Sequence, residues 1–152
     1  MLLWRAAGLV VLALAVATTG RADASDLMTD VVEPYLQVQT ALVNDDLAPV
    51  RDGATRVAKG ARNLGAPGKA IADAATTLAK AESLEGARVA FATLSDTLIA
   101  YADEVDIAIG DHVVAFCPMA DASWVQKGND VANPYYGAAM RTCGEVKRPL
   151  RR

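Results

Sequence analysis

The chain has 152 residues, of which 15 are Lys or Arg and 18 are Asp or Glu, giving a formal net charge of −3. This acidic balance argues against nucleic acid as a partner, because binding to phosphates requires clustered positive charge. Aromatic residues make up only 5% of the chain and alanine is abundant, a composition that favours closely packed helices over a sheet with bulky cross-strand pairs.

The first 24 residues have the pattern of a secretory signal peptide. Arg5 precedes an uninterrupted small and apolar run over residues 6–17, and Ala22-Asp23-Ala24 forms a small-x-small cleavage sequence. The apolar run is shorter than the roughly 20 residues that a membrane-spanning helix requires. We therefore predict cleavage after Ala24, a periplasmic location, and a mature chain of residues 25–152 with no transmembrane segment, long enough for a single domain.

Residues 30–105 show the periodicity of amphipathic helices. Apolar residues recur at steps of three and four, most clearly from Ala87 to Val105. Four helices are expected, over residues 30–44, 47–64, 67–81 and 83–104, with N-cap residues in Asn44-Asp45-Asp46 and at Ser83. Connections of only a few residues favour antiparallel neighbours. The predicted fold class is mainly α, with an up-and-down four-helix bundle over residues 25–105.

The residue pattern changes after Val105. Helical periodicity gives way to β-branched and aromatic residues, namely Ile107, Ile109, Val113, Val114 and Phe116, which favour extended or short-strand structure. From Cys117 to Gly144 the chain is rich in Cys, Met, Trp, Tyr, Asn, Pro and Gly. We expect residues 106–146 to form a short irregular or β-containing Cys/Met module packed on the bundle, and the basic residues 147–152 to form a solvated, disordered tail.

Two pairs of sulfur residues stand in this module, Cys117-x-Met119 and Met140-x-x-Cys143. Thiolate and thioether sulfurs are soft donors, and a site made of them favours Cu(I) over Mg²⁺ or Ca²⁺. The first spacing places both sulfurs on one face of an extended segment, and the second places them on one face of a helical turn. A reversal of the chain at Asn133-Pro134 would bring the two pairs together in one metal site.

Other interpretations of the same residues stay open. In an oxidising compartment, Cys117 and Cys143 are also expected to form a structural disulfide. Met119 and Met140 are of a type that often fills gaps beside aromatic rings. His112 is the only histidine, and it could complete the metal site as an imidazole ligand or lie at the surface beside Asp111.

The sequence contains no recognisable catalytic pattern. It has no phosphate-binding Gly loop, no His-Glu-x-x-His zinc motif and no nucleophile elbow. One histidine is also a poor basis for several acid–base roles. We therefore do not expect an enzyme.

The sulfur-containing segment resembles a known family, as do parts of the helices. The residues that carry the resemblance are Tyr35-Leu36, Ala41-Leu42, Asp45-Asp46-Leu47, Phe91-x-x-Leu94-Ser95, Cys117-Pro118-Met119-Ala120, Trp124, Gln126-Lys127-Gly128, Asn133-Pro134-Tyr135-Tyr136-Gly137, Met140 and Cys143-Gly144. They are similar to the bacterial exported domain of unknown function 3347 across essentially the whole mature chain. That family also occurs as a C-terminal extension of periplasmic adaptor subunits in copper and silver efflux systems.

The resemblance implies a periplasmic protein concerned with heavy metals. The first hypothesis is a soft-metal protein that binds copper, expected as Cu(I), through Cys117, Met119, Met140 and Cys143, with an efflux adaptor or a metal chaperone as partner. The second is a disulfide-stapled helical module that interacts with or regulates an efflux system and binds no metal. A fold shared with a family does not by itself decide between these roles.

Overall fold

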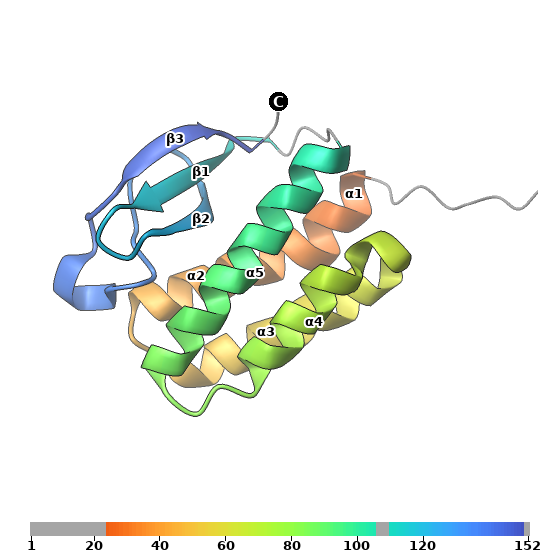
Figure 1. The fold of residues 1–152 in the computed structure, drawn as a ribbon, viewed down its shortest axis with the longest axis horizontal. Helices are drawn as coiled ribbons and strands as arrows, with labels where there is room; N and C mark the ends of the chain where they lie inside the picture. Colours follow the sequence, from red (N-terminus) through yellow and green to blue (C-terminus); the bar gives the residue numbers. More distant parts are fainter. Residues whose placement is uncertain (1–23, 106–109, 151–152) are drawn as a thin grey trace, which may run out of the picture.

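The computed structural model describes residues 24–105 and 110–150 of the chain. Its first part consists of helices that run antiparallel to one another (Figure 1). In chain order the elements are α1 (Ala24–Leu27), the π-helical η1 (Met28–Val32), α2 (Glu33–Val43), α3 (Leu47–Asn63), the 3-10 helix η2 (Ala66–Gly68), α4 (Lys69–Ala79) and α5 (Leu84–Val105). Because α1, η1 and α2 follow one another directly, they form the first of four packed helical segments, which confirms the predicted four-helix fold.

The first helical segment begins at Ala24, before the predicted start at residue 30, while the other helix ends lie within two residues of the predicted bounds. Of the two predicted N-caps, one forms and one does not. The Ser83 hydroxyl accepts a hydrogen bond from the Gly86 N–H at 3.1 Å and caps α5 as expected. Asp46 occupies the N-cap position of α3, but its side chain makes no capping bond. Its neighbour Asp45 adopts a left-handed conformation with φ 59°, and its carboxylate turns instead toward the C-terminal part of the chain.

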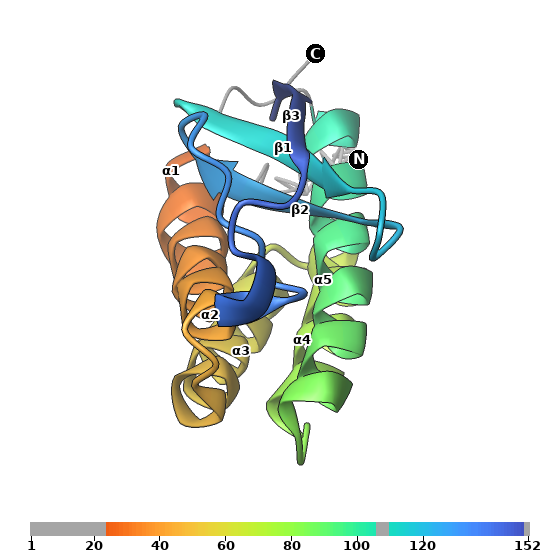
Figure 2. The ribbon, with the colours of Figure 1, turned by 90° about the vertical axis from the view of Figure 1, so that its left-hand side faces the viewer.

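Three short strands follow the helices and form an antiparallel sheet in the order β2-β1-β3. They are β1 (His112–Cys117), β2 (Ala122–Lys127) and β3 (Glu145–Pro149), with a further 3-10 helix, η3 (Gly137–Met140), before β3. The sheet lies to one side of the helices, with β2 nearest to them, as Figure 2 shows, and β2 contacts α5 and α2. The predicted strand character of the segment after Gly110 is therefore confirmed, while residues 106–109 lie outside the described part.

The expected disordered tail is wrong for residues 147–149. These residues belong to β3, which pairs with β1, and Leu150 is buried in the core. Arg148 donates from Nη1 and Nη2 to the two carboxylate oxygens of Asp103 in α5, at 2.9 and 2.7 Å. The basic composition suggested a solvated end because neither a strand partner nor a carboxylate on a distant helix can be seen in local sequence.

A buried aromatic cluster joins the helices to the sheet. The rings of Tyr35 and Phe91 are stacked with centroids 4.9 Å apart, and Tyr135 lies 6.0 Å from both Phe91 and Trp124. The Tyr35 hydroxyl shares a hydrogen bond of 2.6 Å with Ser95 and accepts another from the Val125 N–H at 3.0 Å. Burial raises the pKa of Tyr35 well above its ordinary value. The hydroxyl therefore stays protonated and provides the hydrogen-bond acceptor for the backbone N–H of Val125 in β2.

Replacing Tyr35 by phenylalanine should therefore destabilise the junction. The substitution removes one hydroxyl and leaves the buried Val125 N–H without its acceptor, and we expect the free energy of unfolding to fall by about 1–2 kcal/mol. Urea denaturation measures this loss. Tyr136→Phe is the matched control, because the Tyr136 hydroxyl donates only to the exposed Met119 carbonyl and its loss should cost less than about 0.5 kcal/mol. Equal losses in the two variants would contradict the prediction.

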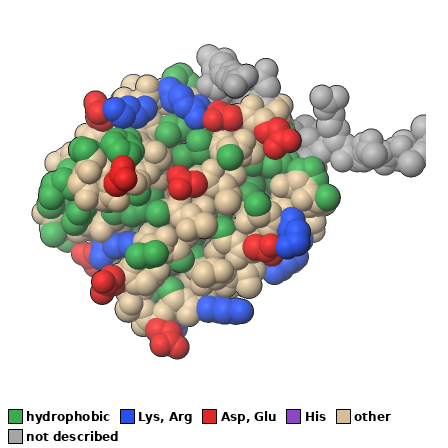
Figure 3. Space-filling model, in the orientation of Figure 1, with side chains coloured by type: hydrophobic (Ala, Val, Ile, Leu, Met, Phe, Trp, Pro, Cys, Tyr) green, Lys and Arg blue, Asp and Glu red, His purple; other side chains and the backbone are tan. Residues whose placement is uncertain are grey.

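Charged side chains do not gather in one place on the face shown in Figure 3. Acidic and basic groups are interspersed there, and hydrophobic side chains are densest at the left, where Figure 1 places η3 and the turns between the strands. Within the described residues, no helix combines the length and the apolar character that a membrane span requires.

Candidate dithiol site

The sheet brings the two cysteines together. Cys117 is the last residue of β1, and Cys143 stands two residues before β3. β1 and β3 are paired with Phe116 opposite Glu145. Cys117 directly follows Phe116 and Cys143 comes two residues before Glu145, so this pairing places the two cysteines close together. The two Sγ atoms lie 3.6 Å apart and both cysteines are free thiols.

The Cys117 sulfur is enclosed by hydrogen-bond donors. Its side chain is fully buried, and burial acts to raise the pKa of the thiol. Hydrogen bonds from the backbone of Ala120, the side chain of Asn133, the Cys143 thiol and the backbone of Met119 outweigh that effect, so the pKa of Cys117 is lowered from its ordinary value. Donors aimed at a sulfur favour its negatively charged form, and this arrangement therefore favours a thiolate at Cys117.

Cys143 is the proton-holding partner of the pair. Its hydrogen bond to Cys117 raises the pKa of the Cys143 thiol, and burial and the charge on Cys117 act in the same direction. The side chain of Cys143 is only half-buried. The pair is thus asymmetric, with an enclosed sulfur whose ionised form is favoured next to a more accessible thiol.

Asn133 links the segments that carry the two cysteines. Its Nδ2 donates to the Cys143 carbonyl at 2.7 Å, and its Oδ1 accepts from the Tyr135 N–H at 2.7 Å. Its own N–H donates to the Arg141 carbonyl at 2.7 Å. Asn133 therefore closes the loop from residue 133 to residue 143 and, through the hydrogen bond to Cys117, holds that loop against the end of β1. Gln126, in contrast, bonds to Trp124 and to backbone groups of residues 128–132.

The two methionines lie close to the cysteines in sequence but differ in setting. Met119 is 60% exposed in the turn after β1, so the extended geometry expected for Cys117-x-Met119 is wrong: the strand ends at Cys117 and the chain reverses at once. Met140 is half-buried at the end of η3. The Cys143 N–H donates to the Met140 carbonyl at 3.2 Å, so the helical turn expected for Met140-x-x-Cys143 is present.

His112 does not join the cysteines. It begins β1 while Cys117 ends it, and five steps along a strand separate their backbones by about 16 Å. The side chain is also 4% exposed, so the expected surface position is wrong as well. Among residues 24–105 and 110–150, no group of three or more His, Cys, Asp or Glu side chains is placed to hold a metal ion.

An ion pair that local sequence did not indicate fastens the η3 segment to the helices. The Asp45 carboxylate pairs with Arg88 of α5 and accepts from the Ala138 N–H at 3.1 Å. Both interactions hold the pKa of Asp45 below its ordinary value, and the hydrogen bond from Ala138 has the larger effect. A Cβ at Gly137, whose φ is 54°, would lie 2.0 Å from Asp45 Oδ1. Glycine is therefore needed at this position, where the chain passes against the Asp45–Arg88 ion pair. Arg88 Nε also donates to the Pro134 carbonyl at 3.1 Å.

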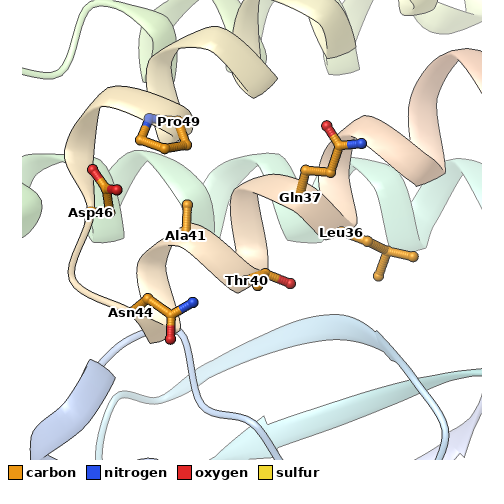
Figure 4. A pocket seen from close by; sticks show the side chains of 7 residues that line it. All are labelled: Leu36, Gln37, Thr40, Ala41, Asn44, Asp46 and Pro49. Carbon is orange, nitrogen blue, oxygen red and sulfur yellow. The ribbon is translucent and has the colours of Figure 1, made fainter.

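An open pocket lies elsewhere, between α2 and the beginning of α3 (Figure 4). Its lining residues are Leu36, Gln37, Thr40, Ala41, Asn44, Asp46 and Pro49. Asp46 is the one ionisable side chain in this lining, and neither cysteine contributes to it. We assign no function to the pocket.

Comparison with known proteins identifies the helical part. A family model described as a protein of unknown function, DUF3347, matches residues 31–109. The chain belongs to the DUF3347 family. The DUF3347 match covers just over half of the chain and ends before Cys117, so it includes the helices and leaves out the sulfur segment on which the resemblance mainly rested. No curated protein and no solved structure matches the chain.

Proposed function

We propose that this DUF3347 protein binds a soft metal ion, most favourably Cu(I), through the thiolates of Cys117 and Cys143 and the thioethers of Met119 and Met140. The observation that carries the proposal is the approach of two free thiols from distant segments, one of them surrounded by hydrogen-bond donors. Thiolates are the form in which cysteines bind metals. A fold that favours a thiolate at a fixed position therefore favours metal binding there.

The sulfur separation suits a shared ion. A disulfide requires about 2.05 Å between the sulfurs, and the observed 3.6 Å is well beyond that. Two metal–sulfur bonds of about 2.3 Å, the Zn–S length taken as a guide, can span at most about 4.6 Å. An ion between Cys117 and Cys143 thus fits with little movement of either sulfur.

The donor set favours copper over zinc. A structural zinc site takes four ligands from Cys, His and carboxylates, and the described residues provide only the two thiols at this place. Cu(I) accepts thiolate and thioether sulfur. Met119 follows Cys117 by two residues and Met140 precedes Cys143 by three, so the thioethers are the donors nearest in sequence to the pair.

The proposed compartment is the periplasm, with a role in heavy-metal handling or efflux. The N-terminal pattern supports export, and cleavage after Ala24 would leave Leu27, which is fully buried in the core, on the mature chain. The resemblance to exported domains attached to copper and silver efflux adaptors supports an adaptor or a metal chaperone as the partner.

The test is an anaerobic titration of the reduced protein with Cu(I) against a chromophoric chelator. We expect one equivalent to bind tightly, binding to be lost in Cys117→Ser and Cys143→Ser, and affinity to be weakened in Met119→Leu and Met140→Leu. Met28→Leu is the matched control, since Met28 lies in η1 among the helices and should leave affinity unchanged. Failure of the wild-type protein to compete with the chelator would refute the metal site.

A second candidate function rests on the same approach of sulfurs. Oxidation of Cys117 and Cys143 to a permanent disulfide would staple the sheet to the η3 segment, and the protein would then serve as a helical interaction module without metal. Thiol counting on protein taken from the periplasm and denatured before labelling separates the two functions. Two reactive thiols favour the metal site, whereas a blocked pair that binds no Cu(I) after reduction favours the staple.

A further inference from the structure

The two cysteines differ in their exposure to solvent, and this difference determines which of them reacts first. Cys117 is fully buried at the end of the central strand β1, and the turn over residues 118–121 covers it with the backbone of Met119 and Ala120. Cys143 is half-buried and follows two exposed residues, Arg141 and Thr142. A molecule arriving from solvent therefore reaches Cys143 first.

We propose that the pair is a thiol–disulfide exchange site whose substrate is a small disulfide, with Cys143 as the entry sulfur and Cys117 as the resolving sulfur. In the first step the Cys143 thiol passes its proton to the Cys117 sulfur 3.6 Å away, and the resulting Cys143 thiolate attacks one sulfur of the substrate. The substrate S–S bond breaks, and one substrate thiolate leaves and takes that proton. In the second step the Cys117 thiolate attacks Cys143 Sγ, the Cys117–Cys143 bond forms, and the second substrate thiolate leaves. The protein loses two electrons and the substrate gains them; the first released substrate thiolate takes up the cysteine proton, and the second is protonated by water.

The second step needs only a small movement. The sulfurs start 3.6 Å apart and must reach about 2.05 Å. Cys117 is held in β1 by pairing with Ala122 of β2. Cys143 lies between η3 and β3, outside regular structure, so its side chain can turn toward Cys117 without breaking a strand pairing.

Exchange would also control the proposed metal site, and this consequence rests on the proposed function. A thiolate consumed in a disulfide is no longer a metal ligand. Closing the Cys117–Cys143 bond therefore removes both thiolates, and a bound ion in turn shields Cys143 from the substrate. Oxidation and metal loading of the pair exclude each other.

The test uses glutathione disulfide as the probe on reduced, metal-free protein, with acid quenching and mass analysis of adducts. Wild type should form the internal disulfide without accumulating an adduct, and Cys117→Ser should accumulate a mixed disulfide at Cys143. Cys143→Ser should react at least ~10-fold more slowly, because its remaining thiol is buried. Rapid quenching of wild type in excess probe locates the first adduct without any substitution, and it should be on Cys143.

Two results would overturn the proposal: a first adduct on Cys117, or a wild-type mixed disulfide that does not resolve. A second arm repeats the reaction after loading with one equivalent of Cu(I). Slower exchange supports mutual exclusion, and an unchanged rate in loaded protein refutes it. If the chelator titration shows no Cu(I) binding, both the metal site and its regulation by exchange are refuted. The exchange reaction itself is then decided by the glutathione disulfide experiment on metal-free protein.

Discussion

Replacing Gly60 by alanine should lower the free energy of unfolding by about 3 kcal/mol, the upper range for an added carbon with no space. A Cβ at Gly60 in α3 would lie 2.0 Å from the carbonyl oxygen of Asp30 and 2.6 Å from its carbonyl carbon. Both are backbone atoms of η1, so no side-chain rotation relieves the clash. The first helical segment and α3 would have to separate, and urea denaturation would report the loss.

Gly86→Ala is the matched control for this substitution. Gly86 is an exposed residue of α5, and a Cβ there would meet only the Ser83 hydroxyl, at 3.4 Å. Since alanine is a better helix former than glycine, the control should gain up to about 1 kcal/mol. Unchanged stability in Gly60→Ala would show that η1 and α3 are not packed backbone to backbone.

Removing the Arg88 side chain should release the η3 segment from the helices. Arg88→Ala deletes the pair with Asp45 and the bonds to the carbonyls of Pro134 and Leu42. We expect about 2 kcal/mol of lost stability, together with faster hydrogen exchange at the Ala138 amide. Because η3 leads directly to Cys143, reaction of this thiol with an alkylating reagent should also accelerate.

Arg56→Ala provides the comparison at an exposed position. The Arg56 side chain is exposed on α3 and donates to Gln37 Oε1, and surface substitutions of this kind change stability little. Its removal should leave Cys143 reactivity unchanged. If Arg88→Ala also leaves both the amide exchange and the thiol reactivity unchanged, the ion pair does not position the segment that carries Cys143.

The candidate site was predictable where it depends on short stretches of chain. The helical turn of Met140-x-x-Cys143 follows from its spacing, and the Cys143 N–H bond to Met140 shows that turn. The extended setting of Met119 failed because Pro118 already belongs to the turn after β1. The position of His112 failed for a different reason: burial of the first residue of a strand depends on what packs over it.

Asn133 shows how much of the site is tertiary. The sequence indicated Asn133 only as part of a chain reversal at Asn133-Pro134, and nothing local foretold the bonds of its side chain. Its position between the Cys117 sulfur and the Cys143 carbonyl exists only once β3 has paired with β1. The same is true of Asp45, one of the three residues expected to supply the cap of α3, which pairs instead with Arg88, 43 residues away.

The sequence by itself determined the four helical segments, the change of structure after residue 105 and the presence of four sulfur donors near the C-terminus. These features rest on periodicity, capping residues and composition, which act over a few residues. Only the tertiary structure decided that β3 pairs beside Cys117, that one thiol is enclosed and the other accessible, and that His112 lies apart. Strand pairing and burial depend on contacts between residues far apart in the chain, and no local pattern records them.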